Sequence, residues 1–260
     1  MNYSSKYSTG LEYIIGNSYR ALNYFSKDID EIYTFNSAKQ SIFGTPYSNP
    51  QSITSYMKPM EYEPMYSINH LFTPEFFLEP SRPKAKFIDD SETVMDIVEE
   101  VFELMMKEKI PDNITIQILA FEEFRDIHSS FGSWSNGILG FSINDKAKKI
   151  FVREMELDAL LLVLGHEIGH VLTETLVNKH DEEAKAFAFS IEWARTIKTH
   201  NIGNLGSSIS NELNFSPARN ALHDVAFQFV RLMLNKGRKV MQLHDDLVKG
   251  YVSVFGGIYS

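Results

Sequence analysis

The sequence feature that most constrains the fold is a strongly apolar stretch at positions 157–176. Between Ala159 and Leu172 its only polar side chains are His166, Glu167 and His170, and most of the other positions are Leu, Val or Ile. Apolar residues on nearly every face of a helix are typical of a central, buried helix rather than a surface one. The chain of 260 residues is long enough to build a core around it, since chains of this size bury roughly three quarters of their unfolded surface.

The polar segment 166–170 reads His-Glu-Ile-Gly-His. On a helix, residues four apart share a face, so His166 and His170 can offer ring nitrogens to one metal ion. Glu167 lies one step round the helix, where its carboxylate can accept a proton from a water beside that ion. Gly169 lets a neighbouring backbone come close to the helix. The segment therefore predicts a Zn²⁺ site with His166 and His170 as ligands and Glu167 as general base.

The absence of cysteine restricts the remaining ligand. It excludes disulfide bonds, thiolate zinc sites, iron–sulfur clusters and cysteine nucleophiles, so any metal must be held by His, Asp or Glu. A third His in the metzincin position is also excluded, because Thr173 and Leu176 stand where that class has Gly and His.

The next acidic residues open a second predicted helix, 181–199. If this helix returns antiparallel to the first, its first turn comes back towards His170. Glu183 is the favoured third ligand, because its carboxylate shares a stripe with the apolar Phe187. Asp181 is the next candidate and Glu182 stays open, although acids at a helix N-terminus are also favoured by the helix dipole alone.

The segment 166–170, followed by Glu183-Ala184-x-x-Phe187-Ala188, resembles the gluzincin metallopeptidases and is most similar to the compact ImmA/IrrE-type peptidases. The resemblance covers roughly 90–199, and Lys185 departs from it, because the family often has Asn or Asp there. It implies peptide hydrolysis with zinc held by two His and one Glu. It also implies an α+β fold, the minimal zincin core, with a small, mostly antiparallel sheet and one helix each for the motif and the third ligand.

The pattern around these helices agrees with that core. A helix from 91 to about 110, a strand at 114–121, a helix at 122–131 and strands at 137–143 and 149–153 are expected. In the zincin core an edge strand binds extended substrate, which makes 137–143 or 149–153 the candidate. We expect two parts: an N-terminal helical segment with a proline- and aromatic-rich arm (1–83), and a zincin-like catalytic domain with C-terminal helices (84–260).

A later helix, from about 217 to 234, carries Asn220, His223 and Asp224. His223 or Asn220 could donate to the oxyanion of the reaction, and we assign His223 a catalytic role. Asp224 could instead orient a ligand histidine. The histidines at 128, 180, 200 and 244 lie in polar surroundings and are expected to face solvent.

These features predict a zinc-dependent metallopeptidase that acts on polypeptides. The alternative is a non-catalytic or autoinhibited zinc-binding protein of regulatory or structural role, with 44–83 as a lid or internal inhibitor.

A net charge of −9 disfavours nucleic-acid binding. With no secretory signal and no apolar run long enough to span a bilayer, we expect no membrane association and a cytoplasmic location. Nothing in the sequence sets the oligomeric state.

Overall fold

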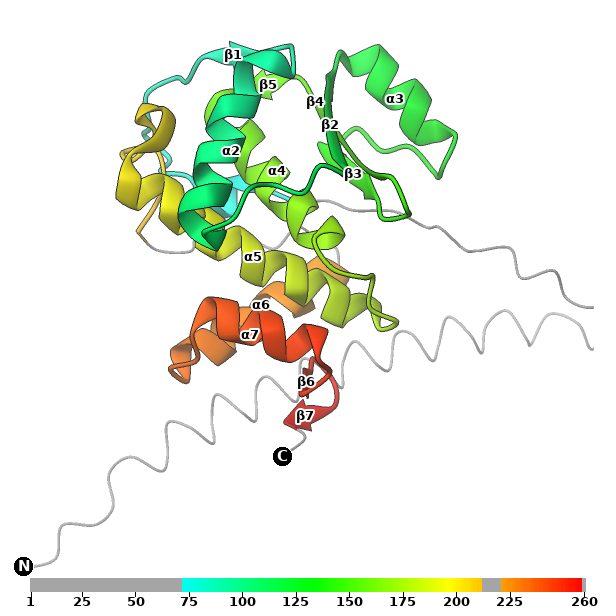
Figure 1. Ribbon diagram of the computed structural model, residues 1–260, viewed down its shortest axis with the longest axis vertical. Helices are drawn as coiled ribbons and strands as arrows, with labels where there is room; N and C mark the ends of the chain where they lie inside the picture. Colours follow the sequence, from blue (N-terminus) through cyan, green and yellow to red (C-terminus); the bar gives the residue numbers. More distant parts are fainter. Residues whose placement is uncertain (1–71, 212–220, 259–260) are drawn as a thin grey trace, which may run out of the picture. The chain divides into compact units, whose positions relative to one another are not determined.

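The computed structural model describes residues 72–211 and 221–258, all within a compact unit formed by Pro64–Ser260 (Figure 1). Three predictions lie outside the described residues: the N-terminal helical segment, the arm up to residue 71, and the placement of Asn220.

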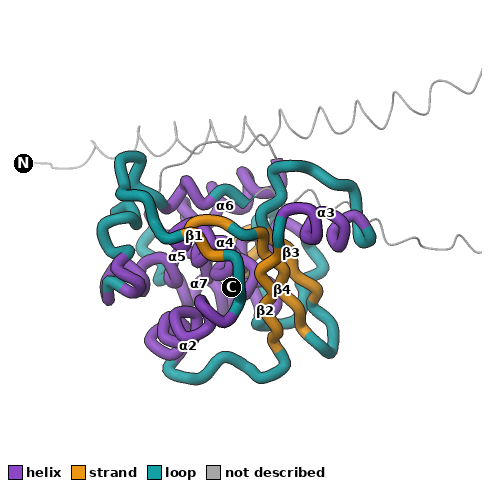
Figure 2. The backbone as a smooth tube through the Cα atoms, turned by 90° about the horizontal axis from the view of Figure 1, so that it is seen from above, coloured by secondary structure: helices purple, strands orange, loops and turns teal. Residues whose placement is uncertain are grey.

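A three-stranded sheet stands at one side of this unit, in the order β2-β4-β3 (Figure 2). The strands are β2 (Ile114–Leu119), β3 (Gly140–Ile143) and β4 (Lys148–Arg153). The β2–β4 pair is parallel, with Ile116 opposite Ile150, and β3 runs antiparallel to β4, with Phe141 opposite Phe151. Two further pairs are antiparallel: β1 (Phe87–Ile88) with β5 (Met155–Glu156), and β6 (Val252–Ser253) with β7 (Gly257–Ile258).

Helices cover both faces of the sheet. The alternation of side chains along β4 directs Ile150 and Val152 into the main core, where α4 (Leu157–Val171) packs. Phe151, between them, points to the other face and joins a smaller cluster with Phe124 of α3 (Phe121–Ser129).

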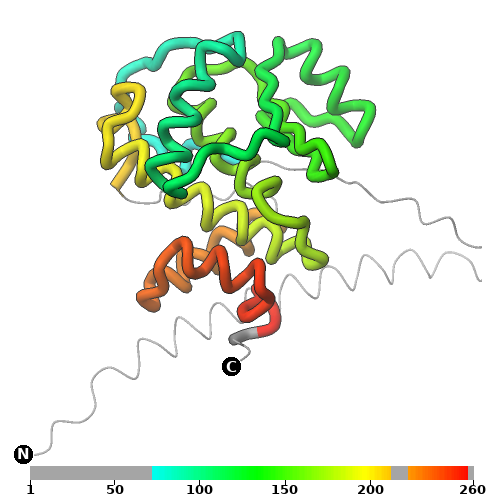
Figure 3. The backbone as a smooth tube through the Cα atoms, viewed as in Figure 1, coloured from blue at the N-terminus to red at the C-terminus, as the bar shows by residue number. Residues whose placement is uncertain are grey.

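The helices that follow α4 in the chain stack beyond it, as the chain trace in Figure 3 shows. α5 (Lys179–His200) packs along α4, and α2 (Glu92–Met106), α6 (Ala221–Asn235) and α7 (Val240–Val248) pack against α5. The α+β class, the α-β-α-β-β order and the C-terminal helices are confirmed. Within 72–211 and 221–258, no helix combines the length and apolar character needed to cross a membrane.

α4 and α5 run antiparallel and approach closely at two glycines. A Cβ on Gly169 would lie 3.0 Å from Cα and 3.1 Å from the carbonyl oxygen of Ala186, and one on Gly165 would overlap the indole of Trp193. The Trp193 ring nitrogen also donates to the Leu161 carbonyl at 2.8 Å. The close approach expected at Gly169 is thus confirmed, with the backbone of α5 as the neighbour.

α4 ends at Val171 rather than at 176. Asn144, in the turn between β3 and β4, donates from its side-chain amide to the carbonyl oxygens of His170, at 3.1 Å, and Thr173, at 2.7 Å. These bonds satisfy carbonyls that the helix end leaves without a partner, so the chain can turn there. The sequence could not show this, because Asn144 comes from a distant turn.

The described end of the arm belongs to the core. Its buried residues are Phe72, Pro74, Phe76, Phe77 and Leu78, around the 3₁₀ helix η1 (Pro74–Phe77). Backbone hydrogen bonds hold it: the Ser210 amide donates to the Phe77 carbonyl at 2.8 Å, and the Glu79 amide to the Ser208 carbonyl at 2.9 Å. The arm residues described, 72–83, therefore belong to the same compact unit as the residues after 83, where a boundary was expected.

Two histidines expected to face solvent are buried. His128 is enclosed by aromatic rings, with Phe141 at 5.0 Å and Trp134 at 5.7 Å between ring centroids, and His244 packs near Phe189. For these two the expectation is wrong, because the side chains that cover them come from other elements. His200, at the end of α5, is exposed as expected.

We predict that Gly169→Ala lowers the free energy of unfolding by about 1–3 kcal/mol, because the added methyl meets backbone atoms that cannot rotate away. Urea unfolding measures the effect. Gly137→Ala is the control, since this glycine is exposed and has no positive φ, and it should change stability by less than about 0.5 kcal/mol. Equal stability of the two variants would contradict the packing described above.

We also predict a pH dependence that comes from His244. Burial lowers the pKa of this imidazole, and the nearby Lys185 acts in the same direction, against Asp245 and Glu182. A lowered pKa in the folded state means that the unfolded chain takes up the proton first, so stability is lost as pH falls below about 6.5. Urea unfolding with chelator at pH 7.5 and 5.5 should show that wild type loses more stability than His244→Gln. His200→Gln is the control for removing an exposed imidazole. The prediction is refuted if the stability difference between wild type and His244→Gln is the same at both pH values.

Candidate metal centre

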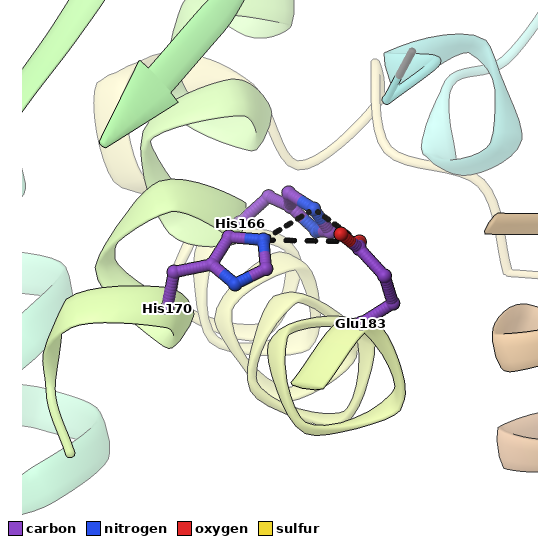
Figure 4. Close-up of side chains that lie close together, drawn as sticks. All are labelled: His166, His170 and Glu183. Carbon is purple, nitrogen blue, oxygen red and sulfur yellow. Dashed lines mark hydrogen bonds and ion pairs between the residues drawn. The ribbon is translucent and has the colours of Figure 1, made fainter. Parts of the chain in front are cut away.

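Residues near the start of α5 and in the C-terminal half of α4 converge on one point in the core (Figure 4). His166 and His170 project from one face of α4, and Glu183 reaches them from the first turns of α5. The two Nε2 atoms lie 3.2 Å apart, and Glu183 Oε2 lies 3.4 Å from His166 Nε2 and 3.7 Å from His170 Nε2. We call this group of three residues the candidate metal centre.

These distances allow a test of fit for zinc. Nitrogen and oxygen ligands at about 2.0–2.2 Å from a tetrahedral zinc lie about 3.3–3.6 Å from one another. The three measured separations, 3.2, 3.4 and 3.7 Å, bracket that spacing. Two imidazoles and one carboxylate also form a ligand set that zinc prefers and that leaves a fourth position for water. The residues fit a catalytic zinc ion.

The other ring nitrogen of each ligand histidine has a protein partner. Ser190 Oγ donates to the Ala186 carbonyl at 2.7 Å and can therefore accept from His166 Nδ1, which lies 3.3 Å away. His170 Nδ1 lies 2.8 Å from Glu182 Oε1, and an ionised carboxylate only accepts, so Nδ1 carries the proton. Both rings are thus held with Nε2 towards Glu183, the arrangement typical of metal-binding histidines.

The structure separates the three acidic candidates for the third ligand. Glu183 faces both Nε2 atoms, whereas Glu182 contacts the outer nitrogen of His170. Asp181 turns the other way and accepts from the Val254 amide at 2.6 Å and the Ser253 hydroxyl at 3.1 Å, in the C-terminal hairpin. Of the three, only Glu183 is placed as a ligand.

The electrostatics of the site favour a cation. Burial would lower the pKa of His170, but the three neighbouring glutamates raise it to about 9. Burial would raise the pKa of Glu183, yet the three surrounding histidines hold it well below its usual value. Burial lowers the pKa of His166 to about 3, which leaves this ring neutral. An ionised carboxylate and a neutral imidazole are the forms that bind metal.

His223 of α6 lies beside the candidate metal centre. Its Nε2 is 3.1 Å from Glu183 Oε2, and the centroid of its ring is 6.1 Å from that of His166. The sequence analysis assigned His223 a role at the zinc site. In the structure His223 does lie beside the candidate metal centre, where it is almost fully buried. Asp224, the alternative on this helix, is only half-buried.

Glu167 lies between the candidate metal centre and the sheet. It is 3% exposed and faces β3, where a Cβ on Gly140 would stand 3.2 Å from its Cγ. Within the described sheet, β4 is paired on both sides and β3 on one side only. An extended peptide could therefore pair with the free edge of β3, beside Glu167. It could not pair with β4, which has no free edge in that sheet.

Two neighbours of His166 were missed in the sequence. Phe72 stacks on its ring at 4.4 Å between centroids and comes from a segment far away in the chain, so no local pattern could reveal it. Ser190 follows Glu183 by seven residues, two helical turns, and therefore shares its face. A small polar residue at that spacing, between the apolar Phe189 and Ile191, was a usable signal.

Comparison with protein-family models, curated proteins and solved structures finds no match for this chain. The candidate metal centre is therefore supported by the geometry of its three residues and by the sequence of the segment 166–170.

We predict that purified wild type binds one zinc ion and that His166→Ala and Glu183→Ala each weaken binding by more than about 100-fold, since loss of an outer partner alone costs about 10–100-fold. Metal analysis and competition with a chelator measure this. Asp181→Asn is the matched control and should retain zinc, because Asp181 is bonded to the hairpin. Zinc lost in the control but kept in Glu183→Ala would refute the ligand assignment.

Proposed function

We propose that this protein is a zinc-dependent metallopeptidase of gluzincin type. The observation that carries the proposal is the spacing of His166 Nε2, His170 Nε2 and Glu183 Oε2, which suits one tetrahedral zinc, with Glu167 next to His166 on the same helix. When bound, zinc supplies a Lewis acid that polarises a carbonyl and brings the pKa of a coordinated water to about 7.

Glu167 is the proposed general base. Its carboxylate accepts a proton from the attacking water, holds it while the peptide carbonyl becomes tetrahedral, and then delivers it to the leaving amine nitrogen. Its position near Gly140 supports this role, because that strand would hold the substrate. The near-complete burial of Glu167 strengthens its electrostatic effect on the reacting atoms.

His223 is the proposed oxyanion donor. Its Nε2 lies 3.1 Å from Glu183 Oε2, close enough to the reacting centre for its N–H to turn to the negative oxygen that develops on the substrate carbonyl. Because one N–H serves one acceptor at a time, His223 would support the Glu183 carboxylate before the reaction and the substrate oxygen during it.

The proposed substrate is a polypeptide in extended form. The free edge of β3 can pair with its backbone, so main-chain hydrogen bonds would position the scissile bond beside Glu167. We further propose that the protein acts in the cytoplasm, a location that the absence of cysteine favours and that fractionation of cells tests.

A second candidate is a zinc-binding regulatory or structural protein without turnover, or a peptidase held inactive. The burial of the site favours it: Glu167, Glu183 and His223 are at most 3% exposed, and Phe72 covers the ring of His166. Screening the zinc-loaded full chain against a peptide library separates the candidates, because cleavage supports the peptidase. Zinc that raises the melting temperature without any cleavage supports the second candidate.

We predict that Glu167→Gln keeps the fold and one zinc ion but lowers peptide cleavage by about 10²–10⁴-fold, the usual contribution of a general base. Cleavage rate and metal content are measured on the same preparation. Glu174→Gln, at an exposed glutamate just beyond α4, is the control and should cleave as wild type does. Full activity in Glu167→Gln would rule out the mechanism.

A further inference from the structure

A buried lysine lies behind the candidate metal centre. Lys185, on α5, has no exposed surface, and its Nζ lies 2.9 Å from Glu182 Oε2. The other oxygen of Glu182 meets His170 Nδ1 at 2.8 Å. A continuous path of charged contacts therefore leads from Lys185 through Glu182 to His170, on the side away from Glu183.

The same lysine also holds the main chain around His170. Its Nζ donates to the His170 carbonyl at 3.2 Å and to the Glu174 carbonyl at 3.3 Å. Glu182 Oε2 accepts in addition from the Leu176 amide at 2.7 Å. The two side chains thus tie the end of α4 and the turn after it to the first turns of α5.

Burying a lysine is costly unless its charge and its N–H groups are satisfied. Here one carboxylate and two carbonyls satisfy them, all within the region that positions His170. Most other side chains of the described core are apolar, no other lysine or arginine is buried among the described residues, and Lys185 is among the largest fully buried side chains. An apolar residue would fill the same space at lower cost, so the charge points to a task at the metal centre.

We propose that Lys185 and Glu182 act together as positioning residues of the metal centre. Lys185 fixes the Glu182 carboxylate in place, and Glu182 fixes the imidazole of His170 so that Nε2 faces the ion. The inference rests on the proposed zinc centre and deepens it, because it assigns the support of one ligand to a pair of residues that touches neither the ion nor the substrate.

The test is a double-mutant cycle on metal affinity in the full chain. Zinc affinity is measured by competition with a chelator for Glu182→Gln, Lys185→Met and the double variant. Each single variant should bind zinc about 10–100-fold more weakly than wild type. The double variant should be no weaker than the weaker single one, because Lys185 acts through Glu182.

The matched control is a second glutamate–basic pair on the same helix with the same spacing. Arg195 Nη1 lies 3.7 Å from Glu192 Oε2 at the surface. Glu192→Gln and Arg195→Met should therefore leave zinc affinity within twofold of wild type. Cobalt substitution adds a readout that a purely structural role would not change. The visible spectrum of bound Co²⁺ should shift in Glu182→Gln and in Lys185→Met but not in the controls.

The outcomes are distinct. Wild-type affinity in both single variants, losses that simply add in the double variant, or unshifted cobalt spectra would overturn the positioning role while the zinc centre stands. Failure of wild type to bind zinc would overturn the zinc centre and this inference together. If Lys185→Met does not fold, Lys185→Gln takes its place, because it keeps a donor for the carbonyls and removes the charge. Wild-type affinity in that variant overturns the proposal equally.

Discussion

The contact between α4 and α5 is the interaction on which the rest of this structure depends. The candidate ligand atoms of His166 and His170 come from one helix and that of Glu183 from the other, so the separation of the helix axes sets the distances from Glu183 to the two histidines. Gly169, packed on the backbone of Ala186, and Gly165, packed under Trp193, allow that separation. Glycine lowers the intrinsic stability of a helix, and its presence twice on one face is explained by the approach that it permits.

Burial of polar groups is the second constraint, and the structure meets it by pairing them with one another. Ser190 and Glu182 each engage the outer nitrogen of one ligand histidine, and Lys185 engages Glu182. The glutamates around His170 favour positive charge at the point where the ligand atoms meet. Phe72, stacked on His166, keeps water from one side of this arrangement, so its electrostatic interactions act through a medium of low polarity.

Much of the core could be predicted because its signals are local. The apolar pattern of 157–176 predicts a buried helix, of which the structure forms 157–171. The segment 166–170 predicts a pair of ligands on one face, and the order of elements between 91 and 153 predicts an α+β core. What could not be predicted depends on side chains from other elements. Asn144 ends α4 early, aromatic rings enclose His128, and the arm enters the core from Phe72.

By itself, the sequence restricted the ligands of any metal to His and carboxylate side chains, since cysteine is absent, and it predicted His166 and His170 on one helix face with Glu167 beside them. Only the tertiary structure decided which acid faces the ligand histidines. Asp181, Glu182 and Glu183 are consecutive on one helix, about 100° apart around its axis, so their side chains point in three directions. The direction in which α5 crosses α4 turns Glu183 inward, Glu182 behind His170 and Asp181 towards the C-terminal hairpin.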